Sequence, residues 1–163
     1  MNVGGQNLVK MDALRQAFES AGLKNVRTFQ QAGNVVFETA AKNPASKIKK
    51  LNTDFKAIIL AVDELAQITK RDPFKRVEGD VMLCVVFLFD KPVTVPKLPL
   101  KSTTENLELI AVKDRAAFVV ARRKKTGWFG FPNNFVEKEL GVTATTRQWS
   151  TIKKLIDFAE RLF

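Results

Sequence analysis

Apolar and polar residues alternate along the first third of the chain in a way that predicts one helix followed by one hairpin. Apolar side chains share a single helical face over residues 11–21, and Gly22 then supplies a stop signal. Residues 26–29 and 35–37 have the alternation of strands, and the polar residues 31–34 between them are typical of a turn. The two strands are therefore predicted to form an antiparallel hairpin.

The middle of the chain is dominated by one long apolar run. Before it, the pattern predicts a short helix over residues 43–51, a strand over 55–60 and a helix over 63–70 that Asp63 caps. Residues 81–89 are apolar at consecutive positions, which is typical of a central strand in a sheet covered on both faces. The segment 90–101 contains three prolines and is predicted to be a linker.

The last third of the chain predicts another hairpin and two helices. Residues 107–112 and 116–121 flank a polar turn, and residues 132–140 form a short predicted helix that Gly141 ends. Helices and strands are thus mixed with hairpins, which predicts an α+β sandwich with a mainly antiparallel sheet rather than a doubly wound sheet.

The final predicted helix begins among polar residues. Thr145 is followed three residues later by glutamine, as in a capping box, and apolar residues at helical spacing predict a helix over residues 146–162. The free N–H groups of such a start would favour an anion beside Thr145, Thr146 and Arg147, with Trp149 as a further contact. The alternative is that Thr145 only caps the helix and Trp149 lies in the core.

Composition limits the chemistry that the chain can carry. The 163 residues include one cysteine and no histidine, which excludes a zinc site, a Ser-His-Asp triad and a Cys-His pair within one chain. Carboxylate, lysine and bound-magnesium chemistry remain, and we assign no catalytic residue, metal ligand or cofactor. Cys84 lies inside the apolar run and is predicted to be a packed small hydrophobe.

Charge is distributed unevenly along the chain. The net charge is +10, and residues 91–163 carry 14 Lys and Arg against 7 Asp and Glu. We predict an N-terminal α+β part over residues 1–90 and a basic C-terminal α+β part over 91–163, within one compact unit. The excess favours a polyanionic partner, although a basic surface can also serve solubility alone.

The densest positive charge stands next to aromatic residues. It is formed by Arg122, Arg123, Lys124 and Lys125, and Trp128 and two phenylalanines follow among glycines. Cations can follow phosphates and aromatic rings can stack on bases, so this segment is the predicted nucleic-acid patch. A charged hairpin end followed by buried aromatics would give the same pattern.

Two further polar loops are candidate ligand sites. The first consists of Gly4, Gly5, Gln6 and Asn7. Its backbone amides could hold a phosphate, but it lacks the spacing of the known glycine-rich phosphate loops, and a plain tight connection is the favoured interpretation. Gln31 and Asn34 could bind a base edge, although ordinary turn chemistry explains them equally well.

Three motifs together resemble the bacterial domain-of-unknown-function family 1697. They are residues 2–7 with 11–15, residues 31–37 and residues 141–151. The resemblance implies a two-part α+β structure with ferredoxin-like character and no established reaction. Proteins of this family normally carry one more apolar strand ahead of the glycine pair, so we expect an open sheet position that invites pairing with another chain.

These observations lead to one expected function and two alternatives. No apolar run approaches the roughly 20 residues that cross a bilayer, and the start lacks a secretory signal, so a cytoplasmic protein is expected. The expected function is non-catalytic binding of an anionic ligand, either nucleic acid or a nucleotide-like phosphate. The first alternative is an enzyme of unknown reaction on a phosphorylated small molecule. Arg147 and the hydroxyls of Thr145 and Thr146 would hold that substrate, and Asp12 or Asp63 would supply a carboxylate. The second is an interaction module that completes its sheet with a partner or by self-association.

Overall fold

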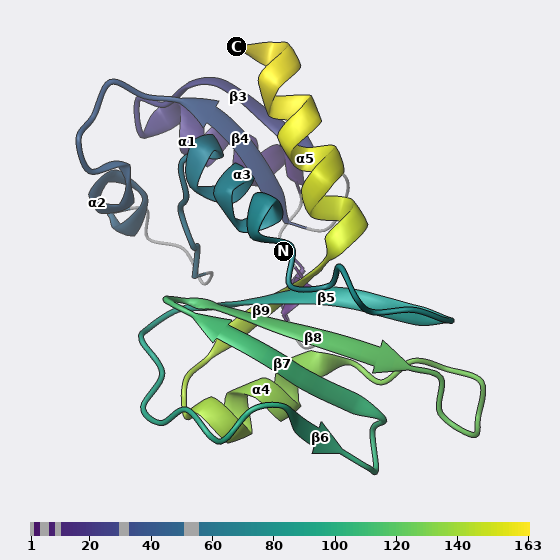
Figure 1. Cartoon of the computed structure of the whole chain (residues 1–163). Coiled ribbons are helices and arrows are strands. Elements are labelled where there is room, and N and C mark those ends of the chain that lie inside the picture. The colour runs from purple at the N-terminus through teal and green to yellow at the C-terminus, as the bar shows by residue number, and fades with distance from the viewer. Residues whose placement is uncertain (1, 4–6, 9–10, 30–32, 51–55) are drawn as a thin grey trace. The chain divides into compact units, whose positions relative to one another are not determined.

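The computed structural model describes residues 2–3, 7–8, 11–29, 33–50 and 56–163 (Figure 1). The chain divides into two compact units, Met1–Ile59 and Leu60–Phe163, and each is described by itself. The predicted boundary after residue 90 falls between two strands of one sheet, both of which belong to the second unit.

The first unit is built around a helix and a hairpin. Its elements are β1 (Asn2–Val3), β2 (Asn7–Leu8), α1 (Met11–Ser20), β3 (Lys24–Phe29), β4 (Asn34–Glu38) and α2 (Pro44–Lys49). Strands β3 and β4 pair antiparallel, as do β1 and β2. The apolar face of α1 buries Leu14 and Phe18 against Val26, and the rings of Phe18 and Phe37 meet edge to face 5.9 Å apart. The predicted first helix and hairpin are confirmed.

Two further predictions concern the rest of the first unit, a short helix that is confirmed and a strand that is wrong. Asn43 caps α2, because its side-chain oxygen accepts the Ser46 N–H at 3.3 Å. The strand predicted over residues 55–60 is wrong in its described part, since residues 56–60 form no strand. A strand requires a backbone partner, whereas here Ile59 contributes its apolar side chain to the core around α1.

The second unit is a five-stranded antiparallel sheet with helices on both faces. Its elements are α3 (Val62–Arg71), β5 (Val81–Leu88), β6 (Leu100–Ser102), β7 (Leu107–Lys113), β8 (Ala116–Arg122), α4 (Pro132–Leu140), β9 (Ala144–Gln148) and α5 (Trp149–Leu162). The strand order is β6-β7-β8-β5-β9. Figure 1 shows α4 on one face of this sheet and α5, with α3 beside it, on the other. The predicted α+β class is confirmed, and the ferredoxin-like detail stays a prediction.

Strand β5 is interior to the sheet, as its apolar sequence predicts. It pairs with β8 on one side and with β9 on the other. Val86 and Leu88 point toward α4 and pack with Val136 and Leu140. Consecutive strand residues point to opposite faces, so the residues between them face α5. Both faces are therefore covered, and five consecutive residues at the end of β5 are buried.

The second hairpin and the fourth helix also agree with the sequence pattern. Strands β7 and β8 pair antiparallel, and helix α4 ends at Gly141 in the left-handed conformation with φ of 69°. The cap of α3 differs from the prediction. Its N-cap is Ala61, whose N–H donates to the Glu64 carboxylate at 2.9 Å, while Asp63 lies in the first turn. Glu64, three residues after the N-cap, takes the role expected of Asp63. Its side chain can reach back to the Ala61 N–H, which has no partner within the helix.

The start predicted for the final helix, at residue 146, is wrong. Residues 144–148 form strand β9, and α5 begins only at Trp149 with Gln148 as its N-cap and no side-chain cap. Strand β9 pairs with β5 from Ala144 opposite Leu88 to Gln148 opposite Cys84. β-Branched threonines fit such a strand, and the ladder of backbone hydrogen bonds with β5 outweighs a single local cap.

Candidate functional site

The segment from the last residue of β8 to the residue before α4, residues 122–131, carries the predicted nucleic-acid patch and is called the basic loop. Arg123 and Phe129 form an isolated antiparallel bridge. Within it, the Lys124 N–H donates to the Trp128 carbonyl at 2.8 Å and the Gly127 N–H donates to the Lys124 carbonyl at 2.9 Å. Gly127 has φ of +87°, which favours glycine. The tip is therefore a hydrogen-bonded tight turn.

The turn before β7 supports the basic loop from one side. Asn106 accepts the Arg122 N–H on its backbone carbonyl at 3.0 Å and donates its amide to the Arg123 carbonyl at 2.8 Å. Gly130 is buried, and a Cβ atom added there would lie 2.5 Å from the Glu105 carbonyl oxygen. The two segments thus touch backbone to backbone, and only glycine fits the contact.

Two of the four cations in the loop are compensated within the protein. The Arg123 guanidinium donates to the Asp80 carboxylate and to the Gly127 carbonyl, and it lies over the Phe129 ring at 4.5 Å from the centroid. Lys124 Nζ lies 3.2 Å from a Glu105 carboxylate oxygen. These contacts hold the loop in shape and pair two of its four positive charges with carboxylates.

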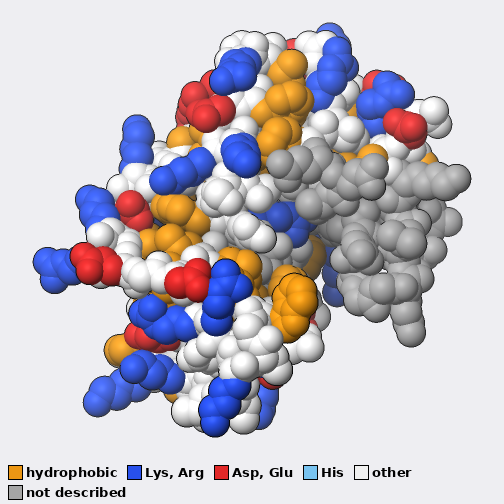
Figure 2. Space-filling model, turned by 90° about the vertical axis from the view of Figure 1, so that its right-hand side faces the viewer, with side chains coloured by type: hydrophobic (Ala, Val, Ile, Leu, Met, Phe, Trp, Pro, Cys, Tyr) orange, Lys and Arg blue, Asp and Glu red, His pale blue; other side chains and the backbone are white. Residues whose placement is uncertain are grey.

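The other two cations keep their charge available. Arg122 and Lys125 are exposed, and in the described part of the chain neither forms an ion pair with an acidic side chain. Arg122 donates to the backbone carbonyl of Glu78 at 3.5 Å, a contact that leaves its charge uncompensated. Figure 2 shows one side of the molecule, on which Lys and Arg side chains are exposed with apolar side chains and Asp and Glu side chains between them.

The aromatic residues of the loop divide into one anchor and two exposed rings. Phe129 is half-buried and packs against the sheet core that faces α4. Trp128 and Phe131 are 77% and 64% exposed. The interpretation of a charged hairpin end followed by buried aromatics therefore describes Phe129 alone. Of the two phenylalanines in the segment predicted as the patch, only Phe131 is exposed.

The predicted anion site at Thr145, Thr146 and Arg147 is divided by the strand. Thr146 faces α4 and donates its hydroxyl to Asn133 at 3.0 Å. Arg147 and Thr145 lie on the opposite face, where Arg147 Nη1 donates to the Thr145 hydroxyl at 2.7 Å and to the Thr146 carbonyl at 2.9 Å. Burial lowers the pKa of the Arg147 guanidinium. Residues 145–147 therefore lie in strand β9 and not at a helix start.

Trp149 belongs to the core. It is 6% exposed, and its ring meets those of Phe74 and Phe118 edge to face at centroid distances of 5.1 and 6.5 Å. Lys153 covers the outer face of the indole at 5.5 Å. The alternative that the sequence left open, a core tryptophan, is the one that the structure supports.

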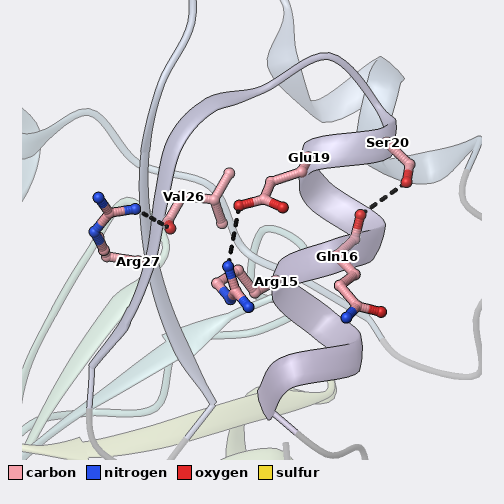
Figure 3. Close-up of polar contacts among 6 residues, drawn as sticks. All are labelled: Arg15, Gln16, Glu19, Ser20, Val26 and Arg27. Carbon is pink, nitrogen blue, oxygen red and sulfur yellow. Dashed lines mark hydrogen bonds and ion pairs between the residues drawn. The ribbon is translucent and has the colours of Figure 1, made fainter.

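The two polar loops of the first unit lie largely outside the described residues, which do not include Gly4, Gly5, Gln6 and Gln31. Asn7 belongs to β2, and Asn34 is a buried residue that begins β4 opposite Phe29. Figure 3 shows the polar contacts around α1 and β3, where Arg15 pairs with Glu19 at 3.4 Å. These contacts are local and bring no set of donors together.

The other reactive groups are either buried or carried by different units. Cys84 is 1% exposed, and burial raises the pKa of its thiol to about 12. Asp12 lies in the first turn of α1 and Asp63 in the first turn of α3, so the two carboxylates belong to different units. Within the described ranges, no group of His, Cys, Asp and Glu side chains could hold a metal ion, and no helix is long and apolar enough to span a membrane.

Comparison with known proteins identifies a family. The model of the family described as "Protein of unknown function (DUF1697)" matches residues 1–118. This range contains the first two motifs of the predicted resemblance, and the third motif, residues 141–151, follows after it. No curated protein and no solved structure gives a significant match. The matched range covers more than half of the 163 residues of the chain, which therefore belongs to the DUF1697 family.

Proposed function

We propose that this protein is a cytoplasmic, non-catalytic binder of nucleic acid and that the basic loop is its contact surface. The observation that carries the proposal is the exposure of Trp128 beside Arg122 and Lys125, the two loop cations without an acidic partner in the described part of the chain. Cations bind phosphates, while an exposed indole offers a flat face to a base. Tryptophan is enriched at interfaces, because its ring offers a large apolar face together with one polar N–H.

The charge of the whole chain supports the same proposal. Residues 91–163 carry 14 Lys and Arg against 7 Asp and Glu, and the basic loop lies within this range. An excess of one sign creates a field that raises the rate at which a polyanion meets the surface. The loop would then act as the local contact within a generally attractive region.

Fluorescence anisotropy with a labelled oligonucleotide tests the proposal directly. At low salt, where charges are least screened, we expect saturable binding that Arg122→Ala combined with Lys125→Ala weakens strongly. The matched control is Lys91→Ala combined with Lys97→Ala, which removes the same charge from two exposed lysines outside the loop. Equal losses in both variants would show a nonspecific charge effect, and no binding by the native protein would remove nucleic acid as the ligand.

A second candidate function is sheet completion by a partner or by another copy of the chain. It is supported by the hairpin of β3 and β4, which among the described residues is a sheet of only two strands. A two-stranded sheet leaves two rows of backbone groups unpaired and is marginal alone. Light scattering over a concentration series tests self-association. A constant monomer mass at every concentration would contradict it.

A further inference from the structure

We infer that the basic loop selects single-stranded over double-stranded nucleic acid, because stacking on Trp128 and Phe131 contributes more to binding than its charge does. This inference rests on the proposed function and deepens it by naming the form of the ligand. Three features of the loop carry the argument: its partial charge compensation, the exposure of the two rings and the fixed shape of its backbone.

The charge available in the loop is small. Asp80 compensates Arg123 and Glu105 compensates Lys124, which leaves Arg122 and Lys125 for phosphates. Each neutralised phosphate of a single strand contributes about −0.7 to the slope of log affinity against log salt, so two cations predict a slope of about −1.4. Proteins that bind duplexes through phosphates use roughly 6–10 such contacts. The charge of the basic loop alone therefore contributes little to its affinity for a duplex.

The exposed rings contribute the binding affinity that the charge of the loop does not. Trp128 is 77% exposed and Phe131 is 64% exposed, so both offer ring faces to solvent. The bases of a duplex are stacked on each other and cannot reach these faces without unpairing, whereas those of a single strand can. Replacing one stacking ring by alanine weakens single-strand binding by about 5- to 150-fold in comparable sites. Two rings thus outweigh two phosphate contacts.

The backbone between the two rings is held in place before any ligand arrives. Phe129 is anchored in the core beneath Arg123, and the turn at Gly127 closes through two backbone hydrogen bonds. Gly130 touches the Glu105 carbonyl, which fixes the chain immediately before Phe131. A preorganised loop loses little conformational entropy on binding. The favourable free energy of its contacts is therefore not offset by the cost of ordering the loop. Gly130 and Glu105 act here as positioning residues.

Competition between strand forms tests the inference. A labelled single strand of about 12 nucleotides and the duplex of the same sequence are titrated with the native protein, and we expect the single strand to bind at least about tenfold more tightly. Trp128→Ala should lower single-strand affinity by about 5- to 150-fold and leave duplex affinity within about twofold. Equal affinity for both forms, or a loss of less than about twofold in Trp128→Ala, overturns the inference.

Intrinsic fluorescence gives a second readout that a purely structural role would not move. The chain contains two tryptophans, the exposed Trp128 and the buried Trp149. Stacking of a base should quench the fluorescence of Trp128. Trp128→Phe should abolish this quenching, and it should retain most of the affinity because an aromatic ring remains at the position. Quenching that persists in Trp128→Phe contradicts stacking at the basic loop. Absence of any binding to either form at low salt is a different outcome, since it refutes the proposed function itself.

Discussion

The ring of Trp149 packs edge to face on the ring of Phe74, with 5.1 Å between the centroids. Phe74 follows α3 and Trp149 begins α5, so this contact joins the two helical segments on one face of the sheet. Phe118 of β8 completes the cluster from below. The two tryptophans of the chain therefore have opposite roles, because Trp149 is a packing residue while Trp128 faces solvent.

Trp149→Ala is expected to lower the free energy of unfolding by about 3–5 kcal/mol, because it removes a large buried ring and leaves a cavity beside Phe74 and Phe118. Thermal or denaturant unfolding measures the loss. Trp128→Ala is the matched control and should change stability little, since that ring is 77% exposed. Similar losses in the two variants would show that the indole of Trp128 is also packed.

Removing the compensating carboxylates should strengthen nucleic-acid binding. Asp80→Asn and Glu105→Gln each free one cation of the basic loop, Arg123 and Lys124 respectively. The salt slope for a single strand should steepen by about 0.7 for each released cation. Anisotropy at several salt concentrations measures it. Asp114→Asn, which makes the same charge change in the turn before β8, should leave the slope unchanged.

Two glycines of the basic loop should respond differently to alanine. Gly130→Ala places a Cβ atom 2.5 Å from the Glu105 carbonyl oxygen, so the loop must move away from the turn before β7. At Gly127 the space is open, and the cost comes only from its φ of +87°, which is about 1 kcal/mol for a residue with a side chain. The melting temperature should therefore fall further in Gly130→Ala. A larger fall in Gly127→Ala would contradict the close approach.

The buried thiol of Cys84 should make stability depend on alkaline pH. Burial raises the pKa of the Cys84 thiol to about 12 in the folded protein, against 9.0 for a thiol in water, so the unfolded chain loses this proton first. Between these two pH values the free energy of unfolding should fall by up to about 1.4 kcal/mol per pH unit from this group.

Comparison with Cys84→Ala isolates that contribution, because the variant lacks the thiol and keeps every other titrating group. The slopes of unfolding free energy against pH should differ above pH 9.0, with the native protein falling more steeply. Identical slopes would show that the thiol titrates at its ordinary pKa in the folded state. A thiol reagent should likewise modify the native protein far more slowly than the unfolded chain.

The elements predicted best from the sequence are those that are determined by residues within or next to the element itself. Helix α4 runs from Pro132 to Leu140 as expected, because Pro at its start and Gly141 at its end act on their own backbone. The apolar run that became β5 is equally clear, since a strand covered on both faces must be apolar throughout.

The errors arise where a distant partner decides the outcome. Thr145 and Gln148 have the spacing of a helix cap, but pairing with β5 draws them into a strand. The partners of the loop cations show the same limit, because Asp80 lies 43 residues from Arg123 and Glu105 lies 19 from Lys124. Charge density along the chain therefore overestimated the charge that the basic loop presents to a ligand.

The position of β5 in the sheet has a consequence for synthesis of the chain. Both neighbours of β5 come later in the sequence, and the second of them ends only at Gln148. While the ribosome works through the intervening residues, β5 emerges as an apolar segment that has no partner strand. Such segments aggregate or recruit chaperones. The yield of this protein in cells is therefore expected to depend on the rate of translation between residues 88 and 148.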